Sequence, residues 1–287
     1  MAEPAPATLS PYTASDGENL AVQDWPVQGG ATRGTVLLVH GLGEHAGRYD
    51  ALARRLNGWG FAVRGYDQYG HGESAGPRGG LTSDTRLLDD LADLVDATRA
   101  RLPAGHPLVL LGHSLGGLVA ARFVAESPAK GWPAVDALVL SSPALDAGLN
   151  PLQRLLLATL PRIAPGLRVG NGLDVDALSH DPAVAAAYRA DPLCHDRISG
   201  RLARFIAQSG PIVQARAADW PVPTLLLWAG QDRLVRPAGS AAFAAAAPPS
   251  TVQAQCFDAL FHEIFNERDS EPVFARLEQW LQARCPA

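Results

Sequence analysis

The amino-acid sequence predicts an α/β fold in which a doubly wound, mostly parallel sheet carries an inserted helical cap. Two observations point to the sheet: short apolar runs recur along the chain, and segments with helical spacing separate them. A third observation points to the cap, because this alternation breaks off between about Asp146 and Asp219. We therefore expect a core made of residues 1–145 and 220–287, with residues 146–219 inserted as the cap.

The predicted strands are short, mostly apolar runs with Gly or Pro close by. Such runs suit strands that are buried on both faces, as in a parallel sheet. They are Thr35–His40, Phe61–Tyr66, Leu108–Gly112, Ala137–Ser141 and Thr224–Ala229. The apolar segment Thr251–Phe257 is interpreted as the last strand.

The segments between these runs predict helices that cover the sheet. Asp84–Leu102 places its apolar residues on one face, with acids and arginines opposite. Ser114–Glu126 and Pro272–Arg284 have similar patterns. In the predicted cap, Pro182–Tyr188 and Ile198–Gln208 have the spacing of short helices, and the alternative for the whole cap is a long crossover between two strands.

Composition and charge narrow the class of protein. The net charge of -5 provides no basic surface for a phosphate backbone, so we expect no nucleic-acid partner. The three cysteines, Cys194, Cys256 and Cys285, lack metal-ligand spacing and are odd in number, so we expect neither a metal site nor a disulfide framework.

The chain start carries no targeting signal in this interpretation. Met1–Tyr12 has neither the basic nor the apolar region of a signal peptide and is interpreted as a flexible lead-in. No stretch reaches the roughly 18 apolar residues that span a bilayer. We therefore expect a cytoplasmic protein, and the sequence leaves its oligomeric state open.

The chemistry of the chain is expected to centre on Ser114. The predicted strand Leu108–Gly112 runs into a Gly-x-Ser-x-Gly motif at Gly112–Gly116 and then into a predicted helix. In the α/β-hydrolase fold this context places a serine on a sharp strand-to-helix turn, where the flanking glycines avoid side-chain clashes. Ser114 is therefore the candidate nucleophile, and the alternative is a serine that only caps the helix.

A serine nucleophile needs a base and a carboxylate that orients the base, and in this fold the chain order is serine, acid, histidine. His262 is the candidate base because it lies after the last predicted strand. Asp232, which follows the strand Thr224–Ala229, is the candidate acid, and Asp146 is the alternative. His113, directly before the serine, is expected to point the opposite way along the strand.

Acyl transfer also needs donors for the developing oxyanion. The strand Thr35–His40 ends at Gly41-Leu42-Gly43, a glycine-flanked loop that can present the backbone N–H of Leu42. Together with the backbone N–H of Leu115, it is predicted to form an oxyanion hole, and the alternative is a simple turn out of the strand. This chemistry requires no cofactor or metal ion.

Together these motifs resemble the monoacylglycerol lipase and lysophospholipase-like family of α/β hydrolases. The matching segments are His40–Tyr49, Gly70–Ser74, Gly112–Gly117, those around Asp232 and His262, and the cap segment Leu178–Leu193. The resemblance implies that Ser114 attacks a fatty-acyl ester of glycerol and that the cap encloses the acyl chain. It also implies that Glu44 and Arg48 lie near the glycerol pocket, where the alternative is a solvated ion pair.

One residue departs from the family pattern. Phe265 lies three residues after His262, where a well-known animal member has a histidine that helps to bind glycerol. The expected substrate is a single-chain acylglycerol or a lysophospholipid, and the alternatives are a short- to medium-chain carboxylesterase, a thioesterase or an acyltransferase. A non-catalytic binding module on the same fold is the remote alternative.

The apolar segment Pro151–Leu160 belongs to the predicted cap. Its leucines, Leu156 among them, are interpreted as packing onto the core, as a wall for the acyl chain, or as a surface that transiently contacts a membrane or micelle.

Overall fold

The computed structural model describes residues 6–29, 32–148 and 164–286. Eight strands of these residues form one sheet in the order β1-β2-β4-β3-β5-β6-β9-β10, which confirms the predicted α/β class. The strands are β1 (Thr8–Thr13), β2 (Asn19–Trp25), β3 (Gly34–Val39), β4 (Phe61–Tyr66), β5 (Leu108–His113), β6 (Ala137–Ser141), β9 (Thr224–Ala229) and β10 (Val252–Phe257).

Six of these strands, from β4 to β10 in the sheet order, run parallel. Strands β3, β5 and β6 are buried at every position, because helices cover both faces of the sheet. This burial explains why the strands are continuous apolar runs in the sequence. Each predicted strand is present, with ends that differ by at most one residue from the prediction.

The interpretation of Met1–Tyr12 as a flexible lead-in was wrong from Thr8 onward. Those residues form β1, which pairs antiparallel with β2 at the edge of the sheet. Its side chains are almost all exposed, so the strand carries no apolar pattern that would reveal it. Pro11 fits such an edge position, where a strand tolerates a missing N–H.

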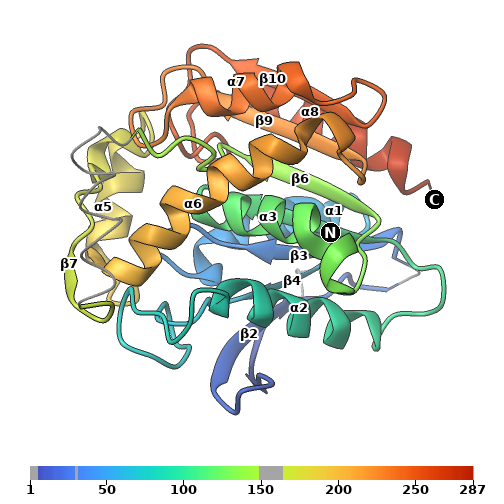
Figure 1. Ribbon diagram of the computed structural model, residues 1–287. Coiled ribbons are helices and arrows are strands. Elements are labelled where there is room, and N and C mark those ends of the chain that lie inside the picture. The colour runs from blue at the N-terminus through green and yellow to red at the C-terminus, as the bar shows by residue number, and fades with distance from the viewer. Residues whose placement is uncertain (1–5, 30–31, 149–163, 287) are drawn as a thin grey trace.

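The helices lie in two layers (Figure 1). Helices α1 (Asp50–Gly58) and α8 (Glu271–Arg284) pack their buried side chains into one core cluster, which includes Val36, Leu38, Val109 and Leu111 of the sheet. Helices α2 (Arg86–Arg99), α3 (Leu115–Lys130), α6 (Gly200–Arg216) and α7 (Pro237–Ala246) contribute to the cluster on the other face. The three helices predicted for the core are therefore confirmed, and the sheet is doubly wound; the short helix predicted at Ile198–Gln208 begins two residues later and continues to Arg216 as α6.

The predicted cap contains α5 (Pro182–Ala190) and a small two-stranded antiparallel sheet of β7 (Arg168–Gly170) and β8 (Arg197–Ser199), which the sequence had not indicated. Helix α6, the last long element of residues 146–219, lies against α3 of the core (Figure 1). The division of the chain at these residues stays a prediction. Leu156 and the other leucines of Pro151–Leu160 lie outside the described residues.

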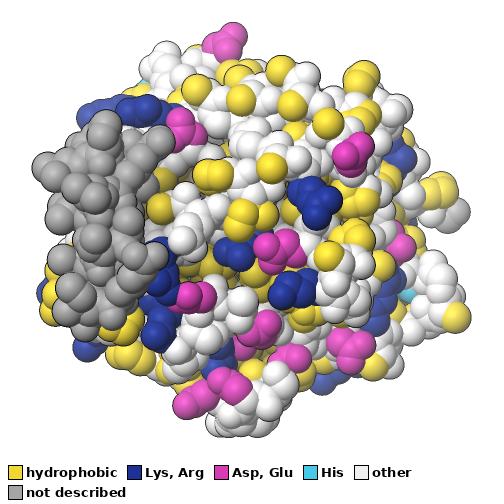
Figure 2. Space-filling view, in the orientation of Figure 1, with side chains coloured by type: hydrophobic (Ala, Val, Ile, Leu, Met, Phe, Trp, Pro, Cys, Tyr) yellow, Lys and Arg dark blue, Asp and Glu magenta, His cyan; other side chains and the backbone are white. Residues whose placement is uncertain are grey.

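Short 3₁₀ helices join these elements at η1 (Ala46–Tyr49), η2 (Val175–Ala177) and η3 (Ala217–Asp219). On the face shown in Figure 2, basic and acidic side chains of the described residues are interspersed. None of the helices in the described part of the chain is both long and apolar enough to cross a membrane.

Candidate active site

Ser114 occupies the turn between β5 and α3 with a strained backbone, at φ 53° and ψ -119°. Its N–H donates to the carbonyl of Ser141, and its carbonyl accepts from the N–H groups of Leu118 and Ala144, which hold this conformation. A non-glycine residue with positive φ is uncommon, and such strain clusters at functional sites. The backbone therefore presents Ser114 as a nucleophile elbow does.

The glycines on either side of Ser114 are required by packing. A Cβ at Gly112 would overlap the carbonyl of Gly116, and a Cβ at Gly116 would overlap the carbonyls of Val39 and His40. The tight turn thus brings α3 directly against the end of β3, where the predicted oxyanion loop begins.

His262 and Asp232 form a buried pair. The Nδ1 of His262 lies 2.6 Å from Oδ2 of Asp232, and both side chains are at most 3% exposed. Burial alone would raise the pKa of Asp232, but the charge and hydrogen bond of His262 and the N–H groups of Val235 and Leu234 hold it below its usual value. Asp232 thus stays ionised and directs the His262 ring, leaving Nε2 for the proton of a nucleophile.

The alternative acid, Asp146, lies elsewhere. Its Oδ1 accepts the N–H of Gly148, and its carbonyl accepts that of Arg236. It lines a groove of about 570 Å³ between α6 and α7, and neither Ser114 nor His262 lines that groove.

His113 does not line the cavity that contains Ser114, in keeping with the expectation that it points the opposite way, but it packs against the candidate base. Its ring lies 4.7 Å from the ring of His262, and its Nδ1 lies 3.0 Å from the hydroxyl of Ser141. Burial, and then the charge of His262, lower the pKa of His113 to about 3. His113 therefore stays neutral and leaves His262 free to take up a proton without a second positive charge beside it.

Ser114 and His262 line one cavity of about 280 Å³, together with both predicted oxyanion residues, Leu42 and Leu115. This volume lies near the lower end of the roughly 300–1,000 Å³ typical of small-molecule sites. Most of the other lining residues are apolar: Ala144, Ala147, Leu173, Ile198, Ala203, Ile206, Leu234 and Val235. The site therefore suits an apolar group next to the nucleophile.

The loop that carries Leu42 is held rigidly from inside the core. The N–H of Gly41 donates to Oε1 of Glu44 at 2.5 Å, and the carbonyl of Gly41 accepts from Nδ1 of His40 at 2.8 Å. Nε2 of His40 accepts the N–H of Gln68, which fixes the ring. Such preorganised backbone geometry is what an oxyanion hole requires.

The cap holds the same loop from the other side. The carbonyl of Gly43 accepts two hydrogen bonds of 2.8 Å, from the hydroxyl of Tyr188 and from the N–H of His195. Gly43 has a φ of +76°, and a side chain there would collide with the carbonyl of His195. Tyr188 and His195 thus fix the Gly43–Glu44 peptide, one residue beyond Leu42.

Glu44 and Arg48, predicted near a glycerol pocket, belong to a buried ion network. The guanidinium of Arg48 donates a hydrogen bond to Glu44. It also donates to both carboxylate oxygens of Glu263, at 2.8 and 3.0 Å. Burial alone would raise the pKa of Glu44, but chiefly the charge of Arg48, together with the hydrogen bond from Tyr49, lowers it to about 2. Sequence reasoning missed Glu263, although it directly follows His262, because Arg48 lies 215 positions away in the chain.

Phe265 contacts the ring of Phe274 in α8, with centroids 5.2 Å apart, and packs against the core. With Glu44 and Arg48 it lines a cavity of about 20 Å³, room for about one water, which includes neither Ser114 nor His262. Contact of Phe265, Glu44 and Arg48 with the substrate stays a prediction. In the structure, Glu44 and Arg48 hold the loops of the site together.

Glu267 braces the loop that carries His262. Its carboxylate, 2% exposed, accepts the N–H of Phe261 at 2.7 Å and lies 2.8 Å from Nδ1 of His180. The ring of His180 stacks on Phe261, with centroids 3.7 Å apart. The contact joins the His262 loop to the cap segment before α5.

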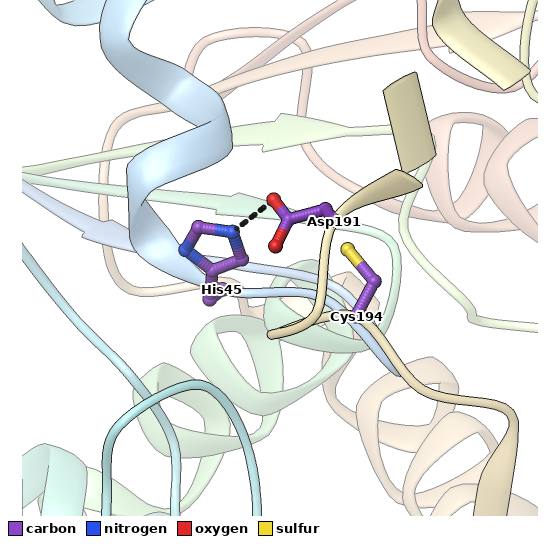
Figure 3. Close-up of side chains that lie close together, drawn as sticks. All are labelled: His45, Asp191 and Cys194. Carbon is purple, nitrogen blue, oxygen red and sulfur yellow. Dashed lines mark hydrogen bonds and ion pairs between the residues drawn. The ribbon is translucent and has the colours of Figure 1, made fainter. Parts of the chain in front are cut away.

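A third contact between cap and core joins His45, Asp191 and Cys194 (Figure 3). The ligand atoms of these residues lie within 4.8 Å of one another, so metal binding has to be considered. The N–H of Gly47 donates to Nδ1 of His45, which places the ring proton on Nε2, where it donates to Asp191 at 2.8 Å. If a metal ion were bound to Nε2 of His45, the ring proton would lie on Nδ1 and would face the N–H of Gly47. The arrangement therefore fits a hydrogen-bonded link between His45 and Asp191.

Comparison with known proteins agrees with this geometry. The family model described as "Serine aminopeptidase, S33" matches residues 30–269. A monoacylglycerol lipase of Mycolicibacterium smegmatis is 36% identical over 87% of this chain and 88% of its own length.

Two solved structures are also similar. The crystal structure of Paleococcus ferrophilus monoacylglycerol lipase has a TM-score of 0.81 and 34% identity, over 93% of this chain and 99% of that one. A soluble variant of monoglyceride lipase from Saccharomyces cerevisiae, in complex with a substrate analog, has a TM-score of 0.87 and 25% identity, over 100% and 97%. The chain therefore belongs to the matched serine aminopeptidase family, as an α/β hydrolase of the monoacylglycerol lipase-like type.

Proposed function

We propose that this chain hydrolyses single-chain fatty-acyl esters, above all monoacylglycerols, through an acyl-enzyme on Ser114. The observation that carries the proposal is the cavity in which Ser114 and His262 meet the apolar side chains of core and cap. The names of the similar lipases support the same substrate class.

The mechanism follows from the positions of these groups. His262, oriented by Asp232, takes the proton of Ser114, and the serine oxygen attacks the ester carbonyl. The N–H groups of Leu42 and Leu115 stabilise the oxyanion, and His262 returns the proton to the leaving alcohol. Water then repeats the cycle on the acyl-serine. A cytoplasmic location and transient contact of the cap with membranes or micelles belong to the same proposal.

A chain-length series tests the substrate. We expect kcat/KM to rise or hold from C4 to C12 monoacylglycerols, because each added methylene gains apolar contact in the cavity. A steady fall with chain length would overturn the proposal and favour a short-chain esterase. Competing alcohols and thioesters would expose an acyltransferase or thioesterase by its products.

Labelling with a fluorophosphonate probe tests the chemistry independently of substrate. Wild-type protein should be labelled, and Ser114→Ala should not. Folded wild-type protein that resists the probe would contradict the serine mechanism and favour a binding module.

A further inference from the structure

The wall of the cavity that contains Ser114 includes a hydrogen-bond donor with no partner among the described residues. Asn171 lines the cavity, and its Nδ2 is buried in that wall without a partner. Leaving a buried donor unsatisfied is unfavourable, and folded proteins do it rarely. A bound group that accepts the hydrogen bond would account for it.

The orientation of this amide is fixed by its surroundings. Asn171 follows β7, and its N–H donates to the carbonyl of Asp196 at 2.6 Å. Its Oδ1 accepts the N–H of Leu173 at 3.0 Å. Because Leu173 offers a donor, the amide atom facing it must be oxygen, so the NH₂ group points the other way.

The NH₂ group lies beside the oxyanion loop. A Cβ built on Gly43 would be 3.4 Å from Nδ2 of Asn171, and Gly43 directly follows Leu42. The donor therefore lies within one residue of the place where the ester group has to bind.

The other polar side chains of the cavity are already engaged. Besides Ser114 and His262, the described lining includes Asp174 and Arg233, which pair with each other at 3.3 Å and are 50% and 60% exposed. They lie at the solvent side of the cavity, which leaves Asn171 as its inner polar group.

We propose that Asn171 recognises the alcohol part of the substrate by donating a hydrogen bond from Nδ2 to a hydroxyl oxygen; this rests on the function proposed above. A saturated acyl chain offers no acceptor. The carbonyl oxygen is assigned to the N–H groups of Leu42 and Leu115, and the ester oxygen receives the proton of His262. The hydroxyls of a glycerol moiety are the acceptors that remain.

The test is the ratio of kcat/KM for 1-dodecanoylglycerol to that for ethyl dodecanoate, which has the same acyl chain and no hydroxyl. Asn171→Leu removes the amide, whereas Asn171→Asp keeps an oxygen for Leu173 and loses the donor. Both variants should lower the ratio about 5- to 30-fold, as the loss of one buried hydrogen bond predicts. The ratio also cancels any uniform loss from misfolding or from the added carboxylate.

Asp176→Asn is the matched control, because Asp176 lies on the same cap segment, is 68% exposed and does not line the cavity. Its ratio should equal that of the wild type. Equal losses on both esters would make Asn171 an oxyanion or structural group and overturn the proposal. An unchanged ratio in both Asn171 variants would also overturn the proposal, because the partner of the amide would then be a buried water.

Failure of the proposed function has a different signature. The wild-type enzyme would then hydrolyse the ethyl ester at least as well as the monoacylglycerol. In that case the ratio would still fall in both Asn171 variants if the amide contacts the hydroxyl.

Discussion

Replacing Arg48 with methionine should destabilise the protein strongly and in a pH-dependent way. The guanidinium bonds Glu44 and both oxygens of Glu263, and these two side chains are 4% and 5% exposed. Arg48→Met would keep the aliphatic volume and leave two buried carboxylates without their cation. Removing one partner of a buried ion pair costs about 3–5 kcal/mol. In a chain of this size that corresponds to a fall in Tm on the order of 10 °C.

The sign of the pH effect follows from Glu44. Its pKa falls from 4.5 to about 2 on folding, so its contribution to stability is present above pH 4.5 and is lost as the pH falls towards 2. Arg48→Met removes the main cause of that shift. The stability difference between wild type and variant should therefore be largest near neutral pH and shrink as Glu44 protonates.

Urea unfolding at about pH 7 and at about pH 4 measures both effects. Arg54→Met is the matched control, because Arg54 pairs with Asp50 at the surface, where the two side chains are 36% and 44% exposed. We expect it to cost roughly 0–1 kcal/mol. A loss below about 1 kcal/mol for Arg48→Met, or one that is as large at pH 4 as at pH 7, would refute the electrostatic argument.

Three further predictions concern the reaction and its loops. In steady-state rate measurements, Asp232→Asn should lower kcat on the order of 10⁴-fold, whereas Asp146→Asn should leave kcat near the wild-type value. The reverse result would assign the catalytic acid to Asp146. Gly116→Ala should fail to fold or melt many degrees lower, because its Cβ would overlap two carbonyls, and a melting curve like that of the wild type would contradict the packing argument. Glu267→Gln should lower both kcat and the rate of fluorophosphonate labelling roughly tenfold or more, because it loosens the His262 loop. The KM should change little. A change confined to KM would exclude this positioning role.

The elements that the sequence predicted well are those in which local pattern and tertiary burial agree. Strands β3, β5 and β6 are buried on both faces, so each of their residues lies in the same apolar environment. The elbow at Ser114 was predictable because its glycines are demanded by backbone contacts. The edge strand β1 carries no such signal, since solvent accepts almost any side chain there.

The supporting contacts of the site were harder to foresee because they join segments that are far apart in the chain. Glu263 meets Arg48 across 215 positions, and Tyr188 meets Gly43 across 145. Neither pair has a spacing rule that a single sequence could reveal. Asn171 is harder still, because an unpaired amide is defined by what surrounds it.

The two hydrogen bonds to the carbonyl of Gly43 have a consequence for how substrates enter. A cap that rose as one body would release Tyr188 and His195 from this carbonyl and free the Gly43–Glu44 peptide, one residue beyond Leu42. An open enzyme of that kind would be a poor catalyst until the cap returned, so entry and chemistry would alternate within each turnover. The same link limits engineering: a cap transplanted from a relative must bring a donor to Gly43, or the transplanted enzyme will bind esters without cleaving them efficiently.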